Sequence, residues 1–192
     1  IRQAIHAWKI PVIVIGVVEA GALGVMESID SADPPRTVAV LATTGTCGSN
    51  AYPKAINRTT GLAGKRIPDV VQQGSVGLAG AIEGDPAFIA TNRSVTTVAQ
   101  VYSGPSIRHE TAKLDQHAME IYGFDPTGMR GAQDVPESLQ LNSVANYVRY
   151  DVATLVRNHK ASGKTTAIDT VVLGCTHFPL VKQEILSAFA DL

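Results

Sequence analysis

Unbroken runs of apolar residues, separated by helical segments, constrain the fold of this chain more than any other feature. The runs are VIVIGVV at Val12–Val18, TVAVLAT at Thr37–Thr43, a weaker one at Ile67–Val71 and AIDTVVLG at Ala167–Gly174. Runs of this kind suit strands that are buried on both faces. Alternation of such strands with helices predicts an α/β fold, with a parallel sheet of about four strands flanked by helices.

Helical spacing of apolar residues predicts the segments between the strands. The predicted helices are a first one with Ile1, Ile5 and Trp8 that ends at Pro11, one capped by Ser49 or Asn50 with Pro53 in its first turn, a short one from Leu114 to Gly123, a longer one with Val144, Val148, Val152 and Leu155, and a last one opened by Pro179. The stretch Asp125–Ser138 is rich in turn residues and is predicted to be a loop.

The length of 192 residues predicts a single α/β lobe over residues 1–192. Residues 92–164 separate the third predicted strand from the last one. We expect them to form a mostly helical insertion, which would serve dimerisation or cover the ligand edge of the sheet. The chain begins inside a predicted helix, so we expect that part of the protein precedes Ile1.

Charge and cysteine content exclude several functional classes. The 17 acidic and 16 basic residues nearly cancel, and no cluster of lysine and arginine is present, which argues against nucleic acid as a partner. The longest apolar region, 10–26, contains Glu19 and is short for a bilayer span, so no membrane helix is predicted. Two cysteines far apart predict no disulfide framework, no zinc site and a reducing cytoplasm.

Polar residues follow two of the predicted strands. Cys175, Thr176 and His177 come after Ala167–Gly174, and a hydroxyl-rich stretch with Thr43, Thr46 and Ser49 comes after the second strand. Parallel sheets bind ligands beyond the carboxyl ends of their strands. We therefore expect both stretches at one edge of the sheet.

The pair Cys175 and His177 suggests thiol chemistry. Side chains two residues apart face the same side if the extended conformation continues through His177. A histidine stabilises a neighbouring thiolate or carries its proton, and the following helix offers free N–H groups. The alternative is a buried structural cysteine beside a histidine that bonds to the backbone.

The hydroxyl-rich stretch suggests an anion site. Thr43, Thr46 and Ser49 are three residues apart, and Gly45 permits a sharp turn. Hydroxyl and amide groups at a helix start suit one carboxylate, whereas the lysine of a phosphate loop is absent. The alternative is ordinary capping and turn chemistry. Cys47 in this stretch is interpreted as a packed side chain.

The strings LGCTHFPL and ATTGTCGSNAY resemble the aspartate/glutamate racemase superfamily, and glutamate racemases most closely. The family pattern Thr-x-x-Thr-x-x-Ser-x-x-Tyr is met by Thr43, Thr46, Ser49 and Tyr52. The resemblance covers residues 1–71 and 167–188. It implies one lobe of a two-lobed fold with an amino acid substrate between the lobes and no cofactor.

The resemblance also implies a mechanism. One cysteine removes the α-proton of glutamate and another returns a proton to the opposite face, which supplies D-glutamate for peptidoglycan in the cytoplasm, in a homodimer. Cys175 would be the acid/base of the second lobe and His177 its tuning partner. Thr43, Thr46, Ser49 and Thr176 would contact the substrate.

The sequence departs from the family in two respects. The first catalytic cysteine, in a Cys-Asn-Thr string, does not occur in these 192 residues, and the family's glutamate near the third strand has no clear match around Gln72, Gln73 and Ser75. We therefore expect a second lobe that is inactive alone. The alternatives are a hydantoin racemase, a malonate-type decarboxylase that keeps one cysteine, and a non-enzymatic binding or assembly lobe.

Overall fold

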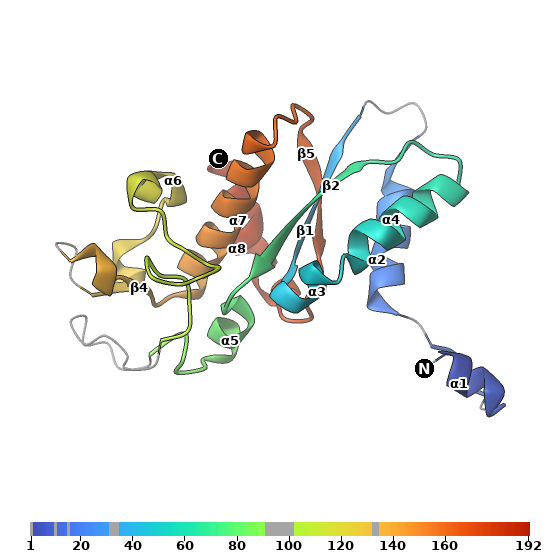
Figure 1. The fold of residues 1–192 in the computed structure, drawn as a ribbon, viewed down its shortest axis with the longest axis horizontal. Coiled ribbons are helices and arrows are strands. Elements are labelled where there is room, and N and C mark those ends of the chain that lie inside the picture. Colours follow the sequence, from blue (N-terminus) through green and yellow to red (C-terminus); the bar gives the residue numbers. More distant parts are fainter. Residues whose placement is uncertain (1, 10, 15, 31–34, 91–101, 132–134) are drawn as a thin grey trace.

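A three-stranded parallel sheet forms the centre of the protein (Figure 1). The structure is a computed structural model that describes residues 2–9, 11–14, 16–30, 35–90, 102–131 and 135–192. The strands are β1 (Thr37–Thr43), β2 (Asp69–Ser75) and β5 (Ile168–Leu173), in the order β2-β1-β5. The predicted parallel α/β fold is confirmed, but within the described residues this sheet has three strands rather than four.

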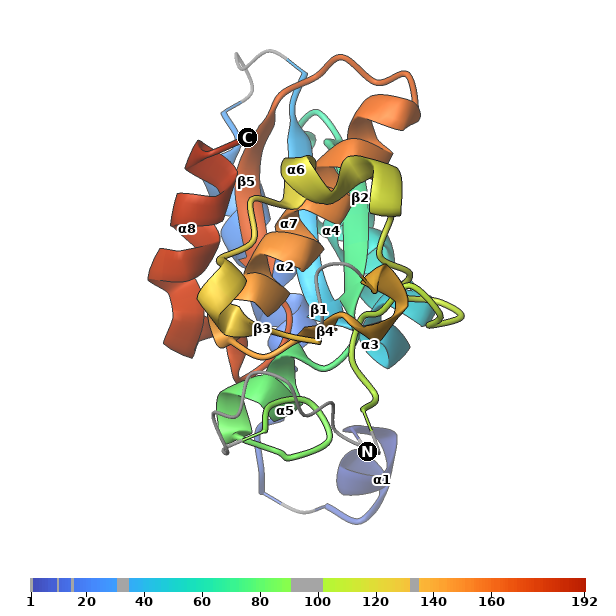
Figure 2. The same ribbon diagram turned by 90° about the vertical axis from the view of Figure 1, so that its left-hand side faces the viewer.

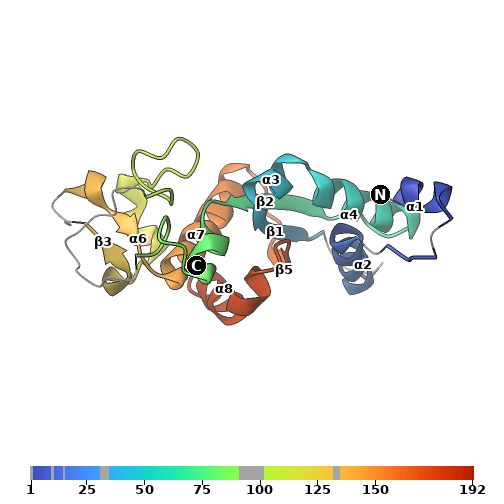
Figure 3. The same cartoon turned by 90° about the horizontal axis from the view of Figure 1, so that it is seen from below.

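Helices cover both faces of the sheet (Figure 3). Helices α2 (Val17–Ser28) and α4 (Ala51–Leu62) pack on one face, and α7 (Val144–Ala161) and α8 (Lys182–Ala190) pack on the other. The central strand β1 sends Val38 and Val40 into the first core and Ala39 and Leu41 into the second. This burial on both faces explains why its sequence is an unbroken apolar run.

The prediction of a strand at Val12–Val18 is wrong. Val12 and Ile13 are 56% and 88% exposed, and helix α2 begins at Val17. Ala22 and Val25, three residues apart, lie on the buried side of this helix. An apolar run of this kind does not distinguish a strand from a buried helix, and the continuation AGALGV is compatible with helical packing.

The other predicted helices agree with the structure. Helix α1 (Arg2–Ala7) lies apart from the body (Figure 1), α4 carries Pro53 in its first turn, and α8 follows a short 3-10 turn, η4 (Phe178–Val181), that contains Pro179. Strand β2 begins at Asp69 and extends to Ser75, beyond the predicted Ile67–Val71.

Short elements form the segment before α7 (Figure 2). They are η1 (Gln116–Ala118), α6 (Met119–Tyr122), η2 (Pro126–Gly128), β3 (Met129–Arg130), η3 (Pro136–Ser138) and β4 (Gln140–Leu141). The predicted short helix ends at Gly123, whereas the predicted loop contains β3, which pairs with β4. Part of the proposed insertion, 92–101 and 132–134, lies outside the described residues, and its boundaries stay a prediction.

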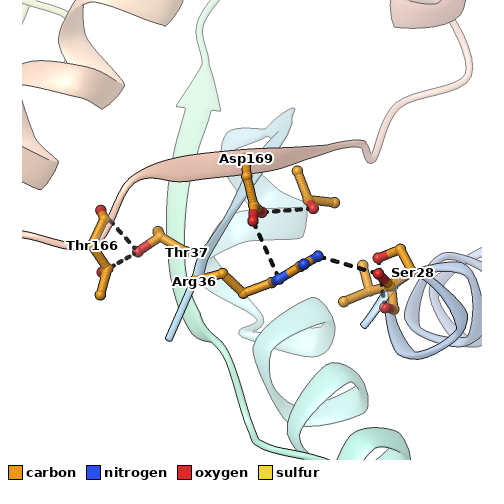
Figure 4. Close-up of polar contacts among 7 residues, drawn as sticks. Ser28, Arg36, Thr37, Thr166 and Asp169 are labelled. Carbon is orange, nitrogen blue, oxygen red and sulfur yellow. Dashed lines mark hydrogen bonds and ion pairs between the residues drawn. The ribbon is translucent and has the colours of Figure 1, made fainter. Parts of the chain in front are cut away.

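Polar contacts fix the amino-terminal end of the sheet (Figure 4). The Arg36 side chain donates to the Ser28 carbonyl at 3.3 Å and pairs with Asp169 at 3.2 Å. The fully buried Thr37 hydroxyl lies 2.6 Å from the hydroxyl of Thr166. These contacts join the end of α2 and the starts of β1 and β5.

Candidate functional site

The carboxyl ends of the three strands lie side by side, as expected. Thr43 at the end of β1 is in register with Ser75 at the end of β2, and Leu41 is in register with Leu173 of β5. Helix α3 (Thr44–Gly48) follows β1, and α5 (Leu78–Glu83) follows β2 (Figure 1). The turn Cys175–His177 follows β5 at the same edge.

A cysteine, a histidine and a glutamate form a chain of contacts at this edge. The Sγ atom of Cys175 lies 3.6 Å from Nδ1 of His177, and Nε2 of His177 lies 2.6 Å from Oε1 of Glu83. The cysteine is half-buried, the His177 side chain is 32% exposed and the Glu83 side chain is 61% exposed. The group is thus in contact with solvent and not sealed in the core.

The backbone leaves the strand before Cys175. The proximity of Cys175 and His177 was inferred from an extended conformation through His177, and that conformation is not present. Strand β5 ends at Leu173, and His177 has helical φ and ψ angles of −81° and −30°. A tight turn therefore brings the thiol and the imidazole together. The turn is fixed because the Gly174 amide donates to the Leu41 carbonyl at 2.7 Å.

Glycine is required at position 174. A Cβ atom there would lie 2.7 Å from Cε2 of Tyr52 and 2.9 Å from Cβ of Ala42. Tyr52, predicted as part of a family pattern, is buried, and its ring packs directly under the turn that carries Cys175. Burial, and then the nearby Cys175, raise the pKa of Tyr52. The tyrosine therefore supports the turn as a neutral side chain.

Glu83 gives the histidine a defined chemical role. A carboxylate that accepts a hydrogen bond from Nε2 favours the tautomer in which Nδ1 is free to accept a proton from the thiol. The same carboxylate stabilises the imidazolium that forms after such a transfer. The contact chain can thus pass a proton between the thiol and the imidazole, while the carboxylate fixes the orientation of the ring.

Sequence reasoning did not identify Glu83. It is the last residue of α5, and Gly84, with φ of +75°, ends the helix directly after it. The helix starts at the same edge of the sheet as the turn of Cys175. A carboxylate eight residues after the end of β2 could therefore have been predicted to lie near Cys175. The family pattern directed attention to Gln72, Gln73 and Ser75 instead.

The hydroxyl groups of the predicted anion site make local contacts at the starts of α3 and α4. The hydroxyls of Thr43 and Thr46 lie 3.0 Å apart at the start of α3. Ser49 donates to the Thr46 carbonyl at 2.7 Å and accepts from the Ala51 amide at 3.2 Å, so its hydroxyl serves the turn before α4. Thr176 is exposed beside Cys175. The substrate contacts of these four residues stay a prediction.

Cys47 lies in a different environment from Cys175. It packs against the core between the sheet and the layer of α2 and α4, whereas Cys175 packs against the core on the face of α7 and α8. Burial raises the pKa of the Cys47 thiol above its ordinary value. A thiol with a raised pKa is present as the reactive thiolate in a smaller fraction at neutral pH, so it reacts more slowly.

A buried carboxyl group lies beneath the end of β2. Asp151 of α7 is fully buried, and its Oδ1 is 3.5 Å from Nε2 of Gln73. Burial raises the pKa of Asp151 to about 7, although Ser75 and Gln73 oppose the rise. The sequence contained a signal for this residue, because Asp151 interrupts the apolar helix face of Val148 and Val152.

The described residues lack the features of a metal centre or a membrane span. They contain no group of three His, Cys, Asp or Glu side chains that could hold a metal ion. In that same part of the chain, no helix is both long and apolar enough to cross a bilayer.

Comparison with known proteins gives a partial match. A glutamate racemase from Levilactobacillus brevis is 32% identical to this chain over 78 residues, which are 41% of the chain and 28% of that protein. A glutamate racemase from Levilactobacillus brevis strain ATCC 367 matches with the same identity and the same coverage. No protein-family model and no solved structure matches the chain. The match supports a racemase-like relationship, over a segment that spans little more than a quarter of its relatives.

Proposed function

We propose that this chain contributes one acid/base thiol to a cofactor-independent amino acid racemase that acts on glutamate. The contact chain from Cys175 through His177 to Glu83 carries this proposal. The partial match to glutamate racemases supports it. In this proposal the protein is an isomerase and its substrate is a small amino acid.

The thiolate of Cys175 removes the α-proton of the bound amino acid. The C–H electron pair stays on the α-carbon as a carbanion, and the thiol holds the proton. A second acid then donates a proton from the opposite face, which inverts the centre. In the reverse direction the Cys175 thiol donates its proton to the carbanion. His177, held by Glu83, stabilises the thiolate form.

Cys47 does not serve as the second acid in this proposal. Ends of neighbouring strands are about 5 Å apart on one wall of a site, so both thiols would approach the substrate from one side. Cys47 also packs into the opposite core, and burial raises its pKa. The opposing acid would come from a separate lobe, so the 192-residue chain alone would not invert glutamate.

The substrate carboxylate would bind near the hydroxyls of Thr43, Thr46 and Thr176, with Ser49 shaping the loop. Hydroxyl and amide donors at helix starts suit an anion of this size. The physiological role proposed for the complete protein is to supply D-glutamate for peptidoglycan, in the cytoplasm and as a homodimer.

A malonate-type decarboxylase is the second candidate. The described edge of the sheet presents one well-placed thiol, Cys175, and a single-thiol reaction needs no opposing base. Here the thiol would protonate the carbanion that forms when CO₂ leaves the substrate. Release of CO₂ from malonate derivatives without exchange at glutamate would favour this reaction.

Proton exchange in heavy water tests the proposed function. The chain alone should be inactive as a racemase and leave L-glutamate uninverted, but the half-reaction proposed for Cys175 should place deuterium at the α-carbon in D₂O, as observed by chiral chromatography and proton NMR. Cys175→Ser should abolish the exchange, and the matched control Cys47→Ser should retain it. Exchange that persists in Cys175→Ser, or inversion by the 192-residue chain, would contradict the proposal.

A further inference from the structure

Two adjoining cavities lie in the segment that precedes α7, away from Cys175. One has a volume of about 550 Å³ and the other of about 410 Å³. Ile107 and Gln116 line both cavities, so the two share a wall. Volumes of this size are typical of sites for small molecules.

The larger cavity is mainly apolar. Its lining includes Ile107, Met119, Met129, Leu139 and two prolines. Leu139 is buried, and the isoleucine and both methionines pack against the core on the face of α7 and α8, which anchors the cavity to the body of the protein. Methionine side chains adapt to irregular apolar ligands.

The smaller cavity carries an excess of positive charge. Its lining includes Lys113, His117, Arg157 and one carboxylate, Asp115. Asp115 pairs with Arg157 at 2.9 Å, so these two opposite charges offset each other. Lys113 forms no ion pair with any residue that the structure describes, and its ammonium remains available to a ligand.

We propose that the two cavities form one binding site for a small molecule with an apolar body and one anionic group. The apolar body would occupy the cavity of Met119 and Met129, and the anion would face Lys113, beside the Asp115–Arg157 pair. A cationic ligand fits poorly, because basic side chains outnumber the single carboxylate. An uncharged ligand would fit the apolar cavity but would gain no attraction from the exposed Lys113.

Isothermal titration calorimetry on the full chain tests this site. The probes are decanoate and decyl phosphate, each below its aggregation concentration, with 1-decanol and decyltrimethylammonium as controls for charge. We expect saturable binding of the anions, one per chain, and weaker binding of the alcohol and the cation. Tighter binding of either anion supports the site and identifies its head group.

Variants locate the binding. Lys113→Glu should weaken binding of the anions by about fivefold to tenfold, because an attraction becomes a repulsion. The matched control, Lys160→Glu at the exposed end of α7, should leave it unchanged. Met119→Asp should weaken binding by at least about tenfold, since it places a charge in the apolar cavity. Ile121→Asp, an exposed position on the same helix, is its control.

Three results would overturn the proposal. They are no saturable binding of either anion, equal affinity for decanoate and the alcohol or cation, and equal effects of Lys113→Glu and Lys160→Glu. Circular dichroism of each variant establishes that it is folded. Because Lys113 is an exposed side chain, its variant keeps the test valid even if Met119→Asp does not fold.

Discussion

Asp151→Asn should make the protein more stable at neutral pH, and by an amount that depends on pH. The folded pKa of Asp151 is raised to about 7 from an ordinary value of 3.8 because the carboxyl group is fully buried. A difference of about 3 in pKa between the folded and unfolded chain corresponds to about 4 kcal/mol. This is an upper value, because the amide introduced by the substitution must also replace the contact that Gln73 makes with Oδ1.

The direction follows from which state holds the proton. Below about pH 4 Asp151 is protonated in both states, and its ionisation has no effect on stability. Between about pH 4 and pH 7 the unfolded chain loses the proton while the folded chain retains it, so the wild-type protein loses stability as the pH rises. Above about pH 7 the penalty is constant. The asparagine is neutral throughout and avoids this loss.

Urea denaturation followed by circular dichroism at pH 5, 6, 7 and 8 measures the effect. The free energy of unfolding of Asp151→Asn, relative to wild type, should rise across this range by about 2 to 4 kcal/mol. Asp191→Asn is the matched control, since Asp191 is half exposed and pairs with Arg149 at the surface. A difference between Asp151→Asn and wild type that stays constant from pH 5 to 8 would refute the reasoning.

Three further predictions concern the turn, the contact chain and the opposite end of the sheet. Gly174→Ala should lower the free energy of unfolding in a urea titration by about 1 to 3 kcal/mol, because its Cβ would meet Tyr52 at 2.7 Å. The control Gly48→Ala should have little effect, because no atom lies within 4 Å of the added Cβ. Glu83→Gln should slow alkylation of Cys175 by iodoacetamide at pH 7 several-fold, since His177 loses its carboxylate partner. The control Glu184→Gln, at an exposed position, should leave the rate unchanged. Equal rates for the two variants, measured by mass spectrometry, would argue against the contact chain. Thr37→Val should cost about 1 kcal/mol, because the part-buried contact with the Thr166 hydroxyl is lost, and an unchanged urea midpoint would show that this contact contributes nothing.

The sequence predicted strand β1 correctly because both of its faces are buried. β1 is the central strand of the parallel sheet, whereas β5, which also reads as an apolar run followed by polar residues, is an edge strand whose residues are mostly only partly buried. The same rule failed at Val12–Val18, because α2 is apolar enough to resemble a strand and periodicity is ambiguous over a short run. A short apolar run therefore distinguishes a strand from a helix only when the elements that pack against it are known.

The site was predictable only in part, because contacts between distant elements are not visible in local patterns. Cys175 and His177 lie two residues apart, so their proximity could be inferred, although a turn and not a strand brings them together. Glu83 is 94 residues from His177, and only the parallel order of β2, β1 and β5 brings it to the same edge. Asp151 is also remote in sequence from Gln73, so its burial depends on the packing of α7 against β2.

The relative reactivity of the two cysteines tests the central claim most directly. The unmodified protein is treated with limiting iodoacetamide at pH 7, and the modified fraction of each thiol is followed by mass spectrometry of peptides. In the proposed function His177, held by Glu83, stabilises the thiolate of Cys175, whereas burial raises the pKa of Cys47, so alkylation should be much faster at Cys175. Equal rates, or faster modification of Cys47, would contradict the assignment of Cys175 as the acid/base thiol.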